Sequence, residues 1–234
     1  MKCYHRYMAP ETTRERIIEA AATLLTEGGR EAVSTRAVGA AAGVQAPTLY
    51  RLFGDKRGLL DAVASHGFAT YLHEKAALKP GADPVQDLRR GWDLHVGFGV
   101  ENPAYYALIY GEPRPGVRSP ATREAEEILA AQVRRIAEAG RLRVSEERAA
   151  HLIHSAAAGM TFQLIGLLPE QRDPALSALA REAVIAAVTT DAPAAGNDGV
   201  AGNAIALRAA LPRLAELSPA ERALLDEWLG RLTV

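Results

Sequence analysis

One short segment carries side chains whose types and spacing suit the reading of DNA. If residues 46–53 are helical, then Pro47, Thr48, Tyr50 and Arg51 share the outward side of that helix. The hydroxyl of Thr48 can hydrogen-bond a base or a phosphate, and Pro47 can contact a thymine methyl group. Arg51 can read guanine or hold a phosphate, and Tyr50 can donate its hydroxyl to a phosphate. This is the chemistry of a helix whose N-terminal residues enter the major groove.

The residues around this segment predict a helical hairpin that would hold it in place. Leu49, Leu52 and Phe53 recur at i, i+3 and i+4, so we expect them to pack inward. Ser34 can cap the preceding helix, and Gly43 suits the left-handed position at which a helix ends. An ordinary helical hairpin with a solvated polar face has the same features. The spacing alone therefore leaves both interpretations open.

The rest of the chain predicts an all-α fold. Its 234 residues are rich in alanine, the best helix former. At five places a capping residue precedes a proline, and each pair predicts a helix start. No alternating apolar and polar run is bounded by turn residues, so we expect no sheet. The expected helices cover residues 11–27, 35–42, 46–53, 56–77, 84–100, 103–110, 120–139, 145–168, 174–190, 204–216 and 219–232.

Three local features set boundaries within this pattern. Gly28 and Gly29 are expected to stop the first helix, and Asp55 is expected to cap the fourth. Residues 191–203 are rich in Gly, Ala, Asn and Asp, and their composition predicts a flexible linker or loop.

Charge and cysteine content narrow the classes of function. Residues 1–60 carry nine Lys/Arg and six Asp/Glu, a net charge of +3, whereas the remainder has a net charge of −4. A basic N-terminal part followed by an acidic remainder indicates that the N-terminal part binds nucleic acid. Cys3 is the only cysteine, so no intrachain disulfide is possible, and the start of the chain lacks a secretory apolar core. The most apolar run, 156–168, is too short for a bilayer, so we expect a soluble, cytoplasmic protein with no membrane partner.

The stretch STRAVGAAAGVQAPTLYRLFGDK, residues 34–56, resembles the DNA-binding domain of the TetR family of bacterial transcriptional regulators. The shared features are the apolar pattern of the first helix, STR at the second, AAGV at the turn, PTLY in the third and F-x-x-K at the fourth. The most specific part is QAPTLYRLFGDKRGLLDAV, residues 45–63. The resemblance covers about the first 65 of the 234 residues.

The resemblance implies DNA contacts at particular positions. They come from the second helix, the third helix and the start of the fourth: Thr35 and Arg36; Gln45, Pro47, Thr48, Tyr50 and Arg51; and Lys56, which would hold phosphate. Two positions depart from the family pattern. Leu52 stands where many members carry His, so a phosphate contact from that position is lost. Gly39 stands where Ala is usual, which is expected to weaken the second helix by up to ~1 kcal/mol.

The resemblance also implies a two-domain chain that forms a homodimer. It places a helix-turn-helix domain at residues 1–56, with an arm at 1–10, and a larger helical ligand-binding and dimerisation domain at 57–234. In such proteins two late helices of each subunit form a four-helix interface, and the helices expected at 145–168 and 174–190 match them. Plain core packing within one subunit would also explain these helices. A dimer is needed physically, because one short helix contacts too few base pairs for useful specificity.

Aromatic and polar residues on the middle helices suggest a pocket for a small organic ligand, since such pockets are mostly apolar with a few polar groups. The candidates are Trp92, His95, Phe98, Tyr105, Tyr106, Tyr110, Phe162 and Gln163. Each of them taken singly also fits a simple role in the core.

The sequence gives little support for a metal site or for an enzyme active site. His151 and His154 are three residues apart on an expected helix and could form a metal pair, but no Cys or carboxylate is placed to complete a site. No phosphate-binding glycine loop, nucleophile elbow or metalloprotease motif is present, so we expect no enzyme and no cofactor.

These observations favour a dimeric, TetR-like repressor that leaves a palindromic operator when a small apolar ligand binds. The main alternative is an α-helical enzyme or small-molecule carrier with an incidental helical hairpin. An architectural DNA binder without an effector, and activation in place of repression, also remain open.

Overall fold

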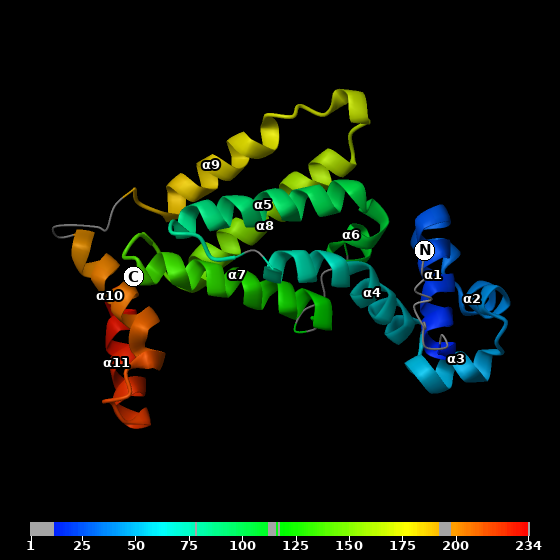
Figure 1. Cartoon of the computed structure of the whole chain (residues 1–234), viewed down its shortest axis with the longest axis horizontal. Coiled ribbons are helices and arrows are strands. Elements are labelled where there is room, and N and C mark those ends of the chain that lie inside the picture. Colours follow the sequence, from blue (N-terminus) through cyan, green and yellow to red (C-terminus); the bar gives the residue numbers. More distant parts are fainter. Residues whose placement is uncertain (1–11, 78, 112–115, 117, 192–197, 234) are drawn as a thin grey trace, which may run out of the picture. The chain divides into compact units, whose positions relative to one another are not determined.

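The computed structural model of the chain is all-helical over the residues it describes, which are 12–77, 79–111, 116, 118–191 and 198–233 (Figure 1). The α-helices are α1 (Thr13–Ala32), α2 (Thr35–Ala42), α3 (Ala46–Phe53), α4 (Lys56–Ala77), α5 (Pro84–Glu101), α6 (Pro103–Tyr110), α7 (Pro120–Glu138), α8 (Glu146–Ile165), α9 (Leu176–Val188), α10 (Asp198–Ala210) and α11 (Pro219–Arg231). Single 3-10 turns, η1 (Pro169–Gln171) and η2 (Leu211–Arg213), follow α8 and α10. Within those residues the sole β-type pairing is an isolated bridge between Leu142 and Thr189.

The predicted helices are present, but several boundaries differ. α8 ends at Ile165 instead of 168, α9 spans Leu176–Val188 instead of 174–190, and α10 ends at Ala210, where the 3-10 turn η2 replaces the helix expected to reach 216. α1 breaks at Gly29, whose φ of 65° and ψ of −169° are not helical, but the chain returns to helix and continues to Ala32. The loop expected at 191–203 was wrong for its second half, because α10 begins at Asp198. α10 buries Ile205 against the core of the larger part of the chain, and this packing outweighs the weak helix propensity of its first residues. Residues 192–197 lie outside the described residues, as does the arm expected at 1–10.

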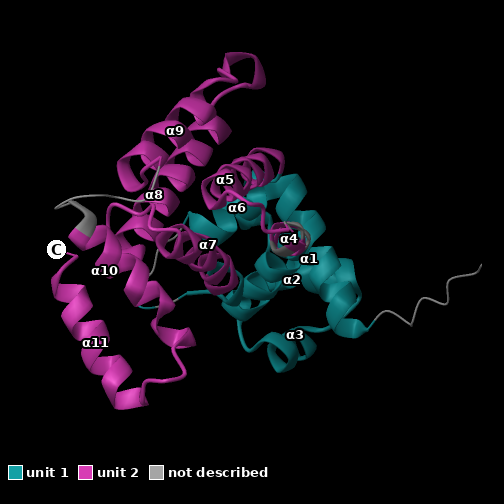
Figure 2. Cartoon of the chain, turned by 60° about the vertical axis from the view of Figure 1, so that its left-hand side comes forward, with its two compact units in different colours: residues 1–70, 102–122 teal, residues 71–101, 123–234 magenta. Residues whose placement is uncertain are grey.

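The chain folds into two compact units (Figure 2). The first unit comprises residues 1–70 and 102–122, and the second comprises 71–101 and 123–234. α4 therefore begins in the first unit and ends in the second. No helix in the described part of the chain is both long enough and apolar enough to cross a bilayer.

The core of the first unit is formed by α1, α2, α3 and α4, and α6 packs against it. It is built from aliphatic side chains, Ile17, Ile18, Ala21, Leu25, Val33, Val38, Ala42, Leu49, Leu59, Leu60 and Val63. Tyr105 and Leu108 of α6 pack against this cluster. The ring of Tyr105 also lies so close to Gly67 of α4 that a Cβ there would come within 2.1 Å of its Cε1 atom. Gly67 thus lets α6 approach α4 closely.

The second unit is a larger helical bundle. Its core includes Trp92 and Val96 of α5, Val133 and Ile136 of α7, Ile153 of α8, Val188 of α9 and Ile205 of α10. α10 and α11 also share a small apolar cluster of their own. An ion pair between Arg208 and Asp226, with an Nε–Oδ1 distance of 2.7 Å, joins these two helices.

Candidate functional site

The turn between α2 and α3 has the geometry that the sequence predicts. Ser34 caps α2, because its Oγ accepts a hydrogen bond from the backbone N–H of Ala37 at 3.1 Å. Gly43 ends α2 in the left-handed conformation, with φ 65° and ψ 36°. Its N–H bonds back to the carbonyl groups of Gly39 and Ala40, which closes the turn.

Gly39 has a structural role that the sequence alone did not reveal. A Cβ at this position would lie 2.9 Å from the carbonyl oxygen of Val44, a backbone atom that cannot easily move aside. The N–H of Val44 in turn donates to the carbonyl of Gly39 at 2.9 Å. The absent side chain therefore lets the backbone after α2 pass close to the helix, in addition to its expected cost in helix propensity.

One side of α3 anchors the helix, as predicted. Leu49 is buried within the core of the first unit, while Leu52 and Phe53 are half-buried and pack against it. The guanidinium of Arg14 on α1 lies 5.3 Å from the centre of the Phe53 ring, a cation–π contact that adds to this anchoring.

The opposite side of α3 faces solvent. Gln45, Pro47 and Arg51 are exposed, Tyr50 is 51% exposed, and Thr48 is half-buried. The side chain of Gln45 makes no capping hydrogen bond, although it occupies the cap position of α3. The outward side predicted from the spacing is thus a polar surface at the N-terminal end of a short helix.

The α2 candidates lie on the same hairpin. Arg36 is exposed and Thr35 is half-buried in the first turn of α2. No acidic residue lies in the first turn of either helix, so both helix N-termini keep their favourable field for a phosphate.

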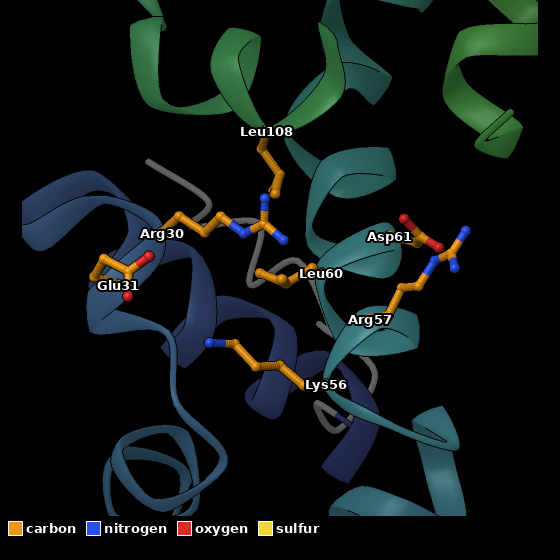
Figure 3. A pocket seen from close by; sticks show the side chains of 7 residues that line it. All are labelled: Arg30, Glu31, Lys56, Arg57, Leu60, Asp61 and Leu108. Atoms are coloured by element: carbon orange, nitrogen blue, oxygen red, sulfur yellow. The ribbon is translucent and has the colours of Figure 1, made fainter. Parts of the chain in front are cut away.

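Lys56, the predicted phosphate ligand, lies at the start of α4 in a hollow of about 500 Å³ (Figure 3). Asp55 caps this helix as expected, since its Oδ1 accepts a hydrogen bond from the N–H of Gly58 at 2.8 Å. The hollow is lined by three basic residues, two acidic residues and two leucines: Arg30, Lys56, Arg57, Glu31, Asp61, Leu60 and Leu108. Figure 3 shows the Lys56 side chain extending toward the end of α1 that carries Arg30 and Glu31. The sequence reasoning missed Arg30 and Arg57, although Arg57 directly follows Lys56.

Residues 17–63 match the family model described as "Bacterial regulatory proteins, tetR family". The chain carries a tetR-family N-terminal domain. The match spans α1, α2, α3 and the start of α4, which together form the hairpin and its support. This confirms the resemblance deduced from the motifs of the first helices.

Solved structures of transcriptional regulators, among them members of the TetR family, share the helical fold over most of the chain. A TetR family transcriptional regulator, PfmR from Thermus thermophilus, is 26% identical, with a TM-score of 0.52 over 79% of this chain and 99% of the other. FadR, a transcriptional regulator from Bacillus subtilis, in complex with stearoyl-CoA, is 15% identical, with a TM-score of 0.60 over 73% and 96%. A TetR variant from Acinetobacter baumannii AYE, in complex with minocycline, is 21% identical, with a TM-score of 0.55 over 73% and 90%. A search of curated proteins found no match.

The candidate ligand residues divide between the two units. Tyr105, Tyr106 and Tyr110 belong to the first unit. Tyr106 is fully buried, and its ring centre lies 4.8 Å from that of Tyr110. The Tyr110 ring also meets Phe68 edge-on, with ring centres 6.2 Å apart. These contacts give the α6 tyrosines packing roles within the first unit.

The other candidates belong to the second unit. Trp92 is buried, and its indole N–H donates to the hydroxyl of Ser177 at 3.0 Å. Phe98 lies against Tyr71 with ring centres 4.9 Å apart. Phe162 and Gln163, at the end of α8, are exposed.

His95 belongs to a buried polar cluster that the sequence reasoning missed in part. Its Nδ1 lies 3.2 Å from the hydroxyl of Tyr71, and Nζ of Lys75 donates to the same hydroxyl at 2.9 Å. Lys75 is only 7% exposed, and burial lowers its pKa to about 8. Burial also holds the pKa of His95 well below its ordinary value, and the nearby Lys75 and His154 lower it further. The signal in the sequence was the i, i+4 spacing of Tyr71 and Lys75 on the helix expected at 56–77.

The two histidines considered as a metal pair lie in different surroundings. His151 is exposed, whereas His154 is half-buried with its ring centre 6.3 Å from that of His95. Among the described residues, no group of three or more His, Cys, Asp or Glu is arranged to hold a metal ion.

Proposed function

We propose that this TetR-family chain acts as a homodimer that binds a palindromic DNA operator and leaves it when a small molecule binds the second unit. The observation that carries the proposal is the exposed polar side of α3, which combines Thr48, Tyr50 and Arg51 at the end of a helix of groove-entering size. The tetR-family match over residues 17–63 supports the same use of that surface.

The proposed contacts divide into positioning and reading. Arg51 reads base edges or holds a phosphate, Thr48 contacts a base or a phosphate, and Tyr50 donates to a phosphate. Lys56 holds the backbone at the start of α4, and Arg36 and Thr35 contact DNA from α2. Because Arg30 and Arg57 share the hollow with Lys56, they add positive charge near the same phosphates.

The proposed dimer uses α8 and α9. These helices pack against each other and carry large exposed apolar side chains, Leu152 at 50%, Phe162 at 37% and Leu179 at 69% exposure. Ser155 and Gly159 add small residues on α8, which allow a close approach of another helix. A second copy would bury these apolar groups and place two α3 helices for two half-sites.

The proposed ligand response draws on structures of the same fold. FadR was solved with stearoyl-CoA and the Acinetobacter TetR variant with minocycline, so proteins of this fold hold chemically different ligands. A ligand changes operator affinity only by its difference in affinity for the bound and released conformations, typically ~1–3 kcal/mol. We propose repression relieved by such a ligand.

The decisive experiment is the selection of bound fragments from genomic DNA with the full chain, followed by a salt titration on the enriched site. We expect a palindromic site and an affinity that falls steeply with salt, because phosphate contacts release counterions. Equal, weak binding to all fragments would overturn the proposal and favour an α-helical carrier or enzyme. Sedimentation of the same sample tests the dimer separately, and a monomer at micromolar concentration would contradict it.

A further inference from the structure

Lys75 is a cation in the interior of the second unit. The side chain is 7% exposed, and its one hydrogen bond within the described residues goes to the hydroxyl of Tyr71. No carboxylate of the described residues lies within 4.0 Å of Nζ, although the structure pairs many of its arginines with Asp or Glu. A buried charge of this kind is costly unless it is paired. The fold therefore holds a positive charge whose counter-ion the described residues do not provide.

The hydrogen bond between Lys75 and Tyr71 has a fixed direction. An ammonium group can only donate, so Lys75 gives a hydrogen to the oxygen of Tyr71. The hydroxyl of Tyr71 also lies 3.2 Å from Nδ1 of His95, and it can donate its own hydrogen there when the ring is neutral and protonated at Nε2. The lowered pKa of His95 agrees with that neutral form. Two N–H groups of Lys75 are left without an acceptor among the described residues.

A second polar group, buried against α5, has no hydrogen-bond partner among the described residues. The amide oxygen of Gln132 on α7 is buried and has no hydrogen-bond partner in the described part of the chain. This amide faces Gly91 of α5, where a Cβ would lie 3.0 Å from both of its terminal atoms. Gly91 is one helical turn before His95. This stretch of α5 therefore lies against the unpaired amide oxygen of Gln132 at Gly91. One turn later, His95 contacts the hydroxyl of Tyr71, which accepts a hydrogen bond from Lys75.

We propose that the second unit binds an organic monocarboxylate whose oxygens accept the two remaining N–H groups of Lys75. A monoanion is favoured because one uncompensated positive charge would leave a phosphate dianion with excess buried negative charge. The aromatic rings of Tyr71 and Phe98 supply apolar surface for the body of the acid. Phe98 and His154 are half-buried, so they are more exposed than Tyr71, Lys75 and His95. This inference rests on the proposed function only in naming the acid as the effector.

The test compares acids with matched neutral molecules on the full chain. The probes are aliphatic and aromatic monocarboxylates, from acetate to dodecanoate and including benzoate, each paired with its primary amide. Binding is followed through the fluorescence of Trp92 in a Trp228→Phe background, because Trp228 is the second tryptophan and is exposed. We expect at least one acid to bind about 10- to 100-fold more tightly than its amide, the range for hydrogen bonds to a charged group.

Two variants assign that preference to Lys75. Lys75→Met should reduce the preference for the acid to less than about twofold, while Lys79→Met, which removes an exposed lysine four residues later, should keep it. Circular dichroism and the unfolding midpoint establish that Lys75→Met is folded. Equal binding of acid and amide, an unchanged preference in Lys75→Met, or no stabilisation by any acid at millimolar concentration would each overturn the proposal.

A spectroscopic readout separates ion pairing from a merely structural role. Lysine labelled with 13C at Cε reports the titration of Lys75, whose pKa of about 8 should rise on binding of the preferred acid. An unchanged titration in the complex would contradict the ion pair. Operator binding is measured in parallel. An acid that binds at Lys75 without changing operator affinity refutes the effector role but leaves the site, whereas failure to bind any operator refutes the proposed function alone.

Discussion

The cations proposed to bind ligands are exposed to solvent in the first unit, whereas the one in the second unit is buried. In the first unit, Arg36 and Arg51 extend into solvent from helices that are held by apolar contacts on their other side. In the second unit, Lys75 lies in the interior beside Tyr71 and His95. An exposed cation loses little hydration before it meets a phosphate, while a buried cation has already lost most of it. The first arrangement suits a large polyanion, and the second suits a single small anion.

This difference predicts separate consequences for function and stability. Residues on the outward side of α3 contribute little to folding, so their loss should affect DNA binding alone. Lys75 carries a desolvation cost in the free protein, so its loss should change stability as well as ligand binding.

The largest expected effect is on DNA binding. Replacing Tyr50 and Arg51 with Ala should weaken operator binding by about 1,000-fold or more, because each half-site loses an arginine contact of ~1–3 kcal/mol and a phosphate contact. Fluorescence anisotropy with the selected operator measures the change. The unfolding midpoint and the dimer should be unchanged. Arg123→Ala, which removes an exposed arginine at the start of α7, is the matched control, and retained affinity in the double variant would refute the role of α3.

The next effect concerns the stability of the second unit. Lys75→Met should stabilise the free protein at pH 7 by about 3 kcal/mol, because burial lowers the pKa of Lys75 from 10.5 to about 8. The folded state keeps the charge below pH 8 at a cost, and between about pH 8 and 10.5 it releases a proton that the unfolded chain retains. Wild-type stability should therefore gain over that range relative to Lys75→Met. Urea unfolding at pH 7 and pH 9.5 measures this, and a difference independent of pH would contradict the buried charge.

The sequence predicted the two regions unequally. In the first unit, Ser34, Gly43 and Asp55 make hydrogen bonds to residues close to them in the chain. Such local interactions can be predicted from a short stretch of sequence. In the second unit, Tyr71 and His95 meet across 24 positions of the chain. The spacing of Tyr71 and Lys75 indicates that they are neighbours on one helix, but nothing in that pattern specifies His95 as their partner on another helix.

A smaller effect tests the buried side chain of Trp92. Ser177→Ala should destabilise the protein by about 1–3 kcal/mol, because it leaves the buried indole N–H without its acceptor. Urea unfolding followed by circular dichroism measures the loss. Glu124→Ala, at an exposed position of α7, should be nearly neutral. In a Trp92→Phe background the cost of Ser177→Ala should vanish, and a cost that persists there would show that Ser177 acts through another contact.

The smallest effects are expected at two helical glycines, and they should differ in sign. Gly97→Ala on α5 should stabilise the second unit by about 0.5–1 kcal/mol, because a Cβ there meets nothing within 4 Å and alanine favours the helix. Gly39→Ala on α2 gains the same helix propensity but places its Cβ 2.9 Å from the carbonyl oxygen of Val44, so it should destabilise the first unit. Unfolding midpoints measure both changes. Because the turn that follows α2 also places α3, Gly39→Ala should weaken operator binding, whereas Gly97→Ala should leave it unchanged. If Gly39→Ala instead stabilised the protein and kept its operator affinity, the close backbone approach would not be what positions α3.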